Sequence, residues 1–445
     1  MSFPRHKGYK PSGSDWMGDI PSSWDARLAR RLFKQMREAA LEGDEQLSAT
    51  QRYGVVPQRL FMELEDQKLM LALGGIGNFK HVEQDDFVIS LRSFQGGIEH
   101  SAYSGCVSPA YTVLRARDAI SPSYFAYALK CSLFVSALQT ATDGIRDGKN
   151  ISYDQFGGIL LPVPPLPEQA AISAFLDREV GKIDALVEEQ KRLIELLKEK
   201  RQAVVSHAVT KGLNPDAPMK NTGIEWLGEV PEHWQVSALK TVATVQTGIA
   251  KGKDFSGVET IEVPYLRVAN VQDGYFDLAE IAMINIPGEL LDRYRLRQGD
   301  VLMNEGGDFD KLGRGHVWDG QIDPCIHQNH VFAVRPHSVL AAWLNLVAGS
   351  DYAQFYFVGR SKQSTNLASI SSTNLMELPV TRPPEQEQIQ IVEFIHAQID
   401  GMDGLMQQAL SAIELLQERR TALIDAAVTG KIDVRGLVET REAAE

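Results

Sequence analysis

Residues 167–212 read PEQAAISAFLDREVGKIDALVEEQKRLIELLKEKRQAVVSHAVTKG, and the architecture of the chain follows from this stretch. Its apolar residues recur every seven positions over about four repeats, which predicts one long helix that pairs with another helix. Prolines before the stretch and Gly212 after it set the two ends. The first heptad row contains Leu176, Ile183, Leu197 and Val204, and the seam beside it is expected to be filled by Leu186 and Leu193.

The partner helix is predicted in the same chain, because residues 384–431 repeat this pattern after a shift of 219 positions. The heptad row continues at Ile395, Met402, Ala409, Leu416 and Leu423. Polar and small residues also match in register, which apolar spacing alone would not produce. The matched pairs include Glu168 with Glu387, Asp184 with Asp403, Arg201 with Arg420, and Thr210 with Thr429.

A second repeat precedes each globular segment. SGSDWMGDIPSSW at residues 12–24 matches TGIEWLGEVPEHW at residues 222–234, with Trp, Gly and Pro at the same offsets. Fixed tryptophans and a proline favour a packed structural role over a ligand site. The chain is therefore predicted to be a tandem duplication of the α+β class, with two mixed α/β domains separated by two long helices that pack as an antiparallel coiled coil.

The two globular segments have the same predicted order of elements. Each has a strand with a glycine loop, then a second strand, a helix-like stretch and a polar loop. In the first segment these are residues 85–98, 107–115, 124–138 and 140–152. In the second they are residues 299–315, 326–335, 339–357 and 358–371. The loops match poorly, as expected for duplicated recognition modules, although unconstrained drift would give the same result.

Composition limits the function classes. No apolar run is long enough for a membrane span, and Cys106, Cys131 and Cys325 are widely spaced, which indicates a reducing, cytoplasmic location without a zinc site. The net charge is −13, which is unfavourable for binding nucleic acid. Residues 1–166 carry 18 basic and 18 acidic groups, whereas residues 213–380 carry 13 and 20. Binding to phosphates would therefore need local basic patches or a more basic partner.

Catalytic motifs are missing from the sequence. There is no GxxxxGK[ST] loop, no HExxH and no GxSxG. His327 and His330 have a spacing that suits a metal, but no carboxylate or thiol nearby completes a site. We therefore predict no catalytic residue and no metal ligand in this chain.

Recognition chemistry remains, because Asn and Gln pair with adenine edges and Arg and Lys with guanine. A solvated loop side chain is the simpler interpretation of each single residue, but the set falls on matched loops of two copies. In the first module the candidates are Arg92, Ser93, Gln95, Arg146, Lys149 and Asn150. In the second they are Gln246, Thr247, Lys251, Lys253, Asn304, Lys311, Arg314, Gln328, Asn329, Lys362 and Gln363.

These features together resemble the specificity subunits of Type I restriction-modification systems. The resemblance covers nearly the whole chain, and its most specific marks are PPLPEQ at residues 164–169, the end of the first helix, and WLGEVPEHW. DFVISLRSFQGGI with VSPAYTVLR, and GDVLMNEGG, are similar to two classes of target-recognition domain. The second helix departs slightly, since PPEQEQ carries an extra Glu-Gln and VTGKIDV replaces VTKGL.

The resemblance implies target-recognition domains at residues 1–163 and 214–381, and conserved helical spacers at residues 164–213 and 382–445. Each domain would read one half of a split, asymmetric site in double-stranded DNA, with half-sites about one helical turn apart. Two modification subunits would supply S-adenosylmethionine and adenine-N6 methylation. Two restriction subunits would supply ATP- and Mg-dependent cleavage. This chain would carry no cofactor of its own.

Two other functions stay open from the sequence. The chain could be a coiled-coil adaptor that does not read DNA, or a self-contained DNA methyltransferase with diverged motifs. Binding of S-adenosylmethionine to the isolated chain would favour the methyltransferase, and a bipartite footprint of the assembled complex would exclude the adaptor.

Overall fold

The computed structural model describes residues 3–65, 77–117, 120–141, 151–253, 255, 257–307, 312–364 and 367–437. The chain divides into two compact units. Unit 1 contains residues 1–190 and 410–445, and unit 2 contains residues 191–409. Both boundaries fall inside the long helices α7 (Leu166–Lys211) and α12 (Glu385–Val428), so each unit contains one half of each helix.

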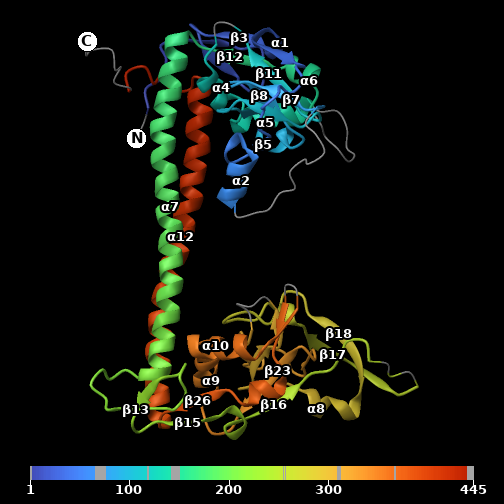
Figure 1. Cartoon of the computed structure of the whole chain (residues 1–445), viewed down its shortest axis with the longest axis vertical. Coiled ribbons are helices and arrows are strands. Elements are labelled where there is room, and N and C mark those ends of the chain that lie inside the picture. Colours follow the sequence, from blue (N-terminus) through green and yellow to red (C-terminus); the bar gives the residue numbers. More distant parts are fainter. Residues whose placement is uncertain are drawn as a thin grey trace. The chain divides into compact units, whose positions relative to one another are not determined.

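The two long helices run side by side (Figure 1), and the heptad row predicted for them is the buried row. Leu176, Ile183 and Leu197 of α7 are buried, while Val204 is half-buried and Val205 takes the buried position. The expected second seam is wrong, because Leu186 and Leu193 are 50% and 40% exposed. Val180 and Val187 are buried instead, and each lies four residues after a residue of the first row, Leu176 and Ile183.

The same ion pair occurs in both units and confirms the antiparallel pairing of the helices. In unit 1, Arg420 Nε donates to Asp184 Oδ1 at 2.8 Å. In unit 2, Arg201 Nη1 donates to Asp403 Oδ1 at 3.1 Å. Asp184 and Asp403 are matched by the 219-residue shift, as are Arg201 and Arg420, so the duplication places one contact twice.

Each unit begins with a short hairpin and a two-stranded sheet that hold the end of a long helix. The hairpins are β1 (Tyr9–Pro11) with β2 (Asp19–Pro21), and β13 (Met219–Asn221) with β14 (Glu229–Pro231). The sheets are β3 (Asp25–Leu28) with β12 (Leu160–Val163), and β15 (Gln235–Ala238) with β26 (Pro379–Arg382). Trp24 and Trp234, predicted as packed residues, are fully buried in the two main cores.

A four-stranded antiparallel sheet forms the centre of each unit, with the same strand order in both. Unit 1 has the order β4 (Phe33–Met36), β11 (Thr112–Ala116), β8 (Phe87–Ile89) and β9 (Glu99–His100). Unit 2 has the order β16 (Ala243–Thr247), β23 (Val331–Pro336), β19 (Val301–Asn304) and β21 (Gly315–Val317). The strands predicted within residues 85–98, 107–115, 299–315 and 326–335 all contribute to these sheets.

The segments that join the sheet strands differ between the units. Unit 1 inserts β5 (Leu47–Thr50), β6 (Gly54–Pro57), α2 (Gln58–Glu65), and β7 (Lys80–Val82), which pairs with β10 (Gly105–Val107). Unit 2 inserts the longer hairpin of β17 (Thr260–Leu266) and β18 (Ala282–Pro287), to which β22 (Ile326–His327) adds. Its 358–371 stretch, expected to be a loop, contains β24 (Lys362–Ser364) and β25 (Leu367–Ser369). β25 pairs with β24 on one side and with β20 (Gly306–Gly307) on the other.

Short helices complete each unit. The two stretches predicted as single helices are each broken into two, α4 (Pro122–Ala128) with α5 (Ser132–Ala141), and α9 (Ala341–Ala348) with α10 (Asp351–Arg360). The second break falls at Gly349 and Ser350. The hydroxyl of Ser350 donates to Val347 O, one of the last carbonyl groups of α9. The remaining short helices are α1 (Ala29–Leu32), α3 (Ser93–Gly96), α6 (Tyr153–Gly157), α8 (Leu291–Tyr294) and α11 (Ser372–Met376). Among the described residues, no helix is both long and apolar enough to cross a bilayer.

Candidate nucleic-acid interface

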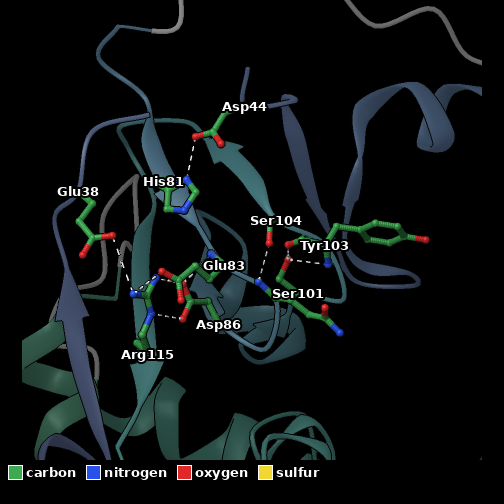
Figure 2. A network of polar contacts seen from close by, with 10 residues as sticks. Glu38, Asp44, His81, Glu83, Asp86, Ser101, Tyr103, Ser104 and Arg115 are labelled. Carbon is green, nitrogen blue, oxygen red and sulfur yellow. Dashed lines mark hydrogen bonds and ion pairs between the residues drawn. The ribbon is translucent and has the colours of Figure 1, made fainter. Parts of the chain in front are cut away.

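A half-buried arginine bound to a buried aspartate fixes the central sheet of each unit. Figure 2 shows Arg115 with Asp86, where Nε and Nη2 each donate to one carboxylate oxygen at 2.8 Å. The hydrogen bond to Asp86 raises the pKa of the Arg115 guanidinium. In unit 2, Arg335 binds Asp300 in the same bidentate way at 2.7 Å. These pairs are scaffold, since each aspartate is almost fully buried and precedes the central strand.

The PEQ motif is also structural. The amide of Gln169 donates to Pro164 O at 2.8 Å and accepts from Ser121 N at 2.7 Å. Gln388 does the same in unit 2, where it donates to Pro383 O at 2.9 Å and accepts from Leu340 N at 2.9 Å. Each glutamine thus ties the start of a long helix to the start of the helix pair on the sheet, which positions the loops beyond it.

Three of the predicted residues of unit 2 come together at the turn between β22 and β23, which we name the 328–330 turn. Ile249 N donates to His327 O at 3.0 Å, and Asn329 N donates to Ile249 O at 3.2 Å. These bonds join the turn to the loop that follows β16. Thr247, Gln328 and Asn329 therefore lie together, with Thr247 exposed and the other two half-buried.

The loop after β16 also carries the predicted Lys251 and Lys253, both exposed. The ammonium group of Lys253 lies 5.6 Å from the centre of the Phe255 ring. Lys362 is exposed on β24, and Gln363 lies on the same strand. Glu305, next to β20, joins the sheet of β24, β25 and β20 to the turn. Its backbone O accepts from Ile370 N, and its backbone N donates to His330 O. Lys251 and Lys253 thus lie in the loop that is joined to the 328–330 turn, and Lys362 lies on the sheet that is joined to it through Glu305.

Three predicted residues of unit 2 face elsewhere. Asn304 is buried, and its Nδ2 donates to Val271 O at 2.9 Å, so this side chain holds the core of the unit. The Nε2 of Gln246 is buried without a hydrogen-bond partner among the described residues. Arg314 lies 3.7 Å from Asp273 and lines a cavity of about 870 Å³ with Arg201 and Asp403 of the long helices. Lys311 lies outside the described residues.

The predicted residues of unit 1 are placed less fully. Arg92 and Gln95 are exposed around α3. Ser93 is buried, and its hydroxyl accepts from Ser90 N at 2.9 Å, so it stabilises the turn instead of facing solvent. The neighbouring Gly97 has φ +87°, and a Cβ there would meet Leu129 O at 2.4 Å, which explains the glycine in QGGI. Arg146, Lys149 and Asn150 lie outside the described residues.

His330 and Glu305 are neighbours of the predicted residues that the sequence analysis did not assign to recognition. His330 Nδ1 lies 2.6 Å from Glu305 Oε2, and Asn329 Nδ2 lies 3.3 Å from His330 Nε2. In the sequence, His330 gave only the weak signal of a possible metal site, through its spacing from His327. The 25-residue separation of Glu305 from His330 hides this contact in the sequence.

The two histidines whose spacing suggested a metal site, His327 and His330, have separate partners. His327 is fully buried and its Nδ1 bonds Val331 O at 2.8 Å, while His330 is engaged by Glu305. Burial lowers the pKa of His327 to about 4, so the ring is neutral at pH 7. The histidines are thus a core residue and a surface residue, with separate partners.

A separate cluster in unit 1 brings together His6, Glu168 and Asp433. The guanidinium group of Arg435 supplies the positive charge of this cluster. Arg435 Nη2 lies 2.6 Å from Asp433, and Arg435 Nε lies 4.0 Å from Glu168. The hydrogen bond from Arg435 lowers the pKa of Asp433 to about 2. The cluster is best explained as an ionic contact between residues near the two ends of the chain.

Comparisons with known proteins agree with this arrangement. Residues 231–415 match a family described as the Type I restriction modification DNA specificity domain. The chain is similar to the EcoKI specificity subunit of Escherichia coli K12, with 23% identity over 80% of this chain and 77% of that protein. It is also similar to the StySPI specificity subunit of Salmonella potsdam, with 24% identity over 73% and 69%.

Two solved structures share the fold. A chain from a study of complex assembly and conformational transition of the type I R-M system aligns with a TM-score of 0.64 at 16% identity. The HsdS subunit from Thermoanaerobacter tengcongensis aligns with a TM-score of 0.51 at the same identity. Both alignments cover 92% of this chain and 98% of the other. The predicted α+β fold with long paired helices is confirmed.

Proposed function

Because this chain belongs with the Type I restriction-modification specificity subunits, we propose that it reads a bipartite, asymmetric target in double-stranded DNA. The observation that carries this proposal is the pairing of one scaffold with two different sets of loops. The central sheet, the arginine–aspartate pair and the PEQ glutamine occur in both units, whereas the inserted segments differ. Two scaffolds of this kind would present two different reading surfaces, and therefore two different half-sites.

We further propose that residues 1–163 and 214–381 are the reading domains, and residues 164–213 and 382–445 the conserved spacers. The helices would set the number of unspecified bases between the half-sites. Base contacts in the second half-site would come from the 328–330 turn and the loop after β16. In the first they would come from the region of Arg92 and Gln95.

The long helices also support the proposal of partner subunits. Large apolar side chains remain exposed along them, away from the buried seam. In unit 1 these are Leu166, Leu186, Leu410 and Leu415, and in unit 2 they are Leu193, Leu196, Phe394 and Leu405. Exposed apolar rows beside a helix pair suit the docking of further helices. Two modification subunits would bind there, and two restriction subunits would join the assembly.

The chemistry would then lie in the partners. S-adenosylmethionine would bind the modification subunits, which methylate adenine at N6, and ATP and Mg would serve the restriction subunits. This chain would act as a non-catalytic subunit in the cytoplasm. It would recognise the DNA target and hold the other subunits together. Its net charge of −13 fits such a division if the partners contribute much of the phosphate-binding charge.

The test is to co-express the chain with the modification subunit of its own system and to map methylated adenines across the host genome. We expect a split, asymmetric motif with a fixed gap. Exchanging residues 12–165 for the corresponding domain of another specificity subunit should change one half-site and leave the other unchanged. A stable complex that methylates no bipartite motif would instead support the adaptor function.

A further inference from the structure

Three side chains at the 328–330 turn form a chain of hydrogen bonds that ends at the protein surface. Glu305 follows β19 and is about one-quarter exposed, while His330 is more than half exposed. The distances are 2.6 Å from Glu305 Oε2 to His330 Nδ1 and 3.3 Å from His330 Nε2 to Asn329 Nδ2. We propose that Asn329 reads an adenine of the second half-site in the major groove. Glu305 and His330 would act as its positioning residues. This inference rests on the function proposed above.

The carboxylate sets the direction of each hydrogen bond. An ionised glutamate only accepts, so Nδ1 of His330 must carry a proton and donate it to Glu305. In the neutral ring Nε2 is then an acceptor, and it takes one hydrogen from the amide nitrogen of Asn329. The amide of Asn329 is therefore oriented by its neighbours, with the nitrogen toward His330. A fixed amide loses less conformational freedom on binding than a freely rotating one.

The rest of the amide matches one base edge. One amide hydrogen of Asn329 and its Oδ1 have no hydrogen-bond partner within the described part of the chain. A donor next to an acceptor is the complement of adenine, which presents its N7 acceptor beside its N6 donor. Guanine presents two acceptors, N7 and O6, so Oδ1 would face O6 without a hydrogen bond. The fixed amide would thus select adenine over guanine.

The backbone holds Asn329 at the edge of the sheet. Its N–H donates to Ile249 O, and Glu305 N donates to His330 O at 2.9 Å, so both ends of the side-chain network are attached to the scaffold. The exposed Lys251 and Lys253 follow in the loop joined to this turn, and such cations suit phosphate contacts, which fix the register of a protein on DNA. Base readout by Asn329 and phosphate contacts from the next loop would be complementary.

The first experiment uses the complex with the modification subunit and DNA duplexes that carry the mapped target. Each adenine of the second half-site is replaced singly by 7-deazaadenine, which lacks the N7 acceptor. At one position we expect a loss of affinity of roughly 5- to 10-fold for the wild type, the effect of one hydrogen bond. The Asn329→Ala complex should show no further loss at that position. Equal losses in both complexes at every adenine would overturn the inference.

The second experiment maps methylated adenines in cells that express the variants. Asn329→Ala should relax the second half-site at one base and lower specific binding by roughly 10- to 100-fold. The first half-site and the gap should stay unchanged. Asn285→Ala is the matched control, because Asn285 is exposed on β18, which is separated by β17 from the strand β22 that leads into the turn. An unchanged second half-site in Asn329→Ala would refute the role of Asn329 and leave the bipartite motif, and so the proposed function, intact.

The positioning roles have their own readout, the ratio of affinities for adenine and 7-deazaadenine at the contacted position. Glu305→Gln keeps an oxygen that can accept from His330 Nδ1, so this ratio should stay near the wild-type value. Glu305→Ala and His330→Ala release the amide and should bring the ratio close to 1. Thermal unfolding of each variant separates this effect from loss of folding. A wild-type ratio in Glu305→Ala would show that the network does not orient Asn329.

Discussion

Unit 1 and unit 2 have the same sheet order, and they differ in what is inserted between the sheet strands. Unit 1 inserts the β5–β6 hairpin and α2, and unit 2 inserts the β17–β18 hairpin with β22 added. The bonds that orient the sheet are kept, because Arg115 with Asp86 and Arg335 with Asp300 have the same geometry. The comparison teaches that the duplication preserved the parts that position the loops and let the loops themselves diverge.

The preserved parts are not identical in detail. Trp234 Nε1 donates to Glu387 Oε1 at 3.1 Å, and His233 Nε2 lies 2.8 Å from the other oxygen of Glu387. In unit 1, the equivalent Trp24 Nε1 is buried with no hydrogen-bond partner among the described residues. Glu168 takes the place of Glu387 and faces His6 at 3.6 Å. The same pair of residue types, a tryptophan and a glutamate, therefore has different hydrogen-bond partners in the two units.

The largest loss of stability is expected when the arginine bound to the buried Asp86 or Asp300 is removed. Arg335→Ala would leave the carboxylate of Asp300 buried without its partner, and we expect it to destabilise unit 2 by about 3–5 kcal/mol. Arg115→Ala should do the same to unit 1. Hydrogen exchange followed by mass spectrometry would report each unit separately.

Arg295→Ala is the matched control, because Arg295 makes a bidentate pair with Asp323 at the surface, with both side chains 40% or more exposed. We expect a cost below about 1 kcal/mol there. Equal costs for Arg295→Ala and Arg335→Ala would contradict the scaffold role of Asp300.

The next largest effect is expected to be a difference between the two units in their stability at acid pH. Burial lowers the pKa of His327 to about 4, whereas an unfolded histidine titrates near 6.5. A lowered folded-state pKa means that the stability is complete above pH 6.5 and is lost as the pH falls toward 4. The loss in unit 2 is expected to be about 3 kcal/mol.

His327→Gln should flatten this pH dependence in unit 2 and leave unit 1 unchanged. The measurement is the unfolding free energy of each unit between pH 7 and pH 4, followed by hydrogen exchange. The same pH dependence in His327→Gln as in the wild type would assign the acid lability to another group.

A smaller difference in stability is expected between the phenylalanine variants of Trp24 and Trp234. Trp234→Phe removes the hydrogen bond to Glu387, while Trp24→Phe removes an N–H group that has no partner among the described residues. The lost ring volume is the same in both. We therefore expect Trp234→Phe to cost about 1–2 kcal/mol more than Trp24→Phe. Chemical denaturation with local exchange readout would measure this difference, and equal costs would mean that the two sites are equivalent.

The smallest effect is expected at the interhelical ion pairs. Asp184 with Arg420 and Asp403 with Arg201 are all more than one-third exposed, so each pair should contribute about 0–1 kcal/mol. Exchanging Arg201 and Asp403 should restore whatever Arg201→Ala loses. A double-mutant cycle in each unit gives the coupling energy, and values that differ between the units would show that the two halves of the helix pair are not equivalent.

The repeat itself made much of the fold predictable from the sequence. The 219-residue shift places Asp184 on Asp403 and Arg201 on Arg420, and these residues do pair across the helices. The strands were predictable because DDFVIS and GDVLMN each place a buried run directly after an aspartate. The second seam was assigned to Leu186 and Leu193, but Val180 and Val187 are the buried residues, since burial depends on the angle around the helix axis.

The candidate site was less predictable, because loop side chains acquire their roles through contacts distant in sequence. Asn304 and Ser93 have the residue types of base readers, yet their polar atoms stabilise the core and a turn. Glu305 carries no recognition pattern of its own, and only the fold brings it to His330. Thr247, Gln328 and Asn329 were candidates by residue type, and the backbone bonds of Ile249 with His327 and Asn329 are what bring them together.

The division of the long helices has a consequence for biosynthesis. Unit 1 is incomplete without residues 410–437, whose Asp433 N donates to Pro4 O and whose Gly430 O accepts from the hydroxyl of Tyr9. Residues 1–190 therefore leave the ribosome well before the helix that covers their core. At 5–20 residues per second, this delay lasts roughly 10–50 s. During that time the buried face of α7 in unit 1 is an obvious substrate for chaperones, whereas unit 2 completes its own core as soon as residue 409 has been added.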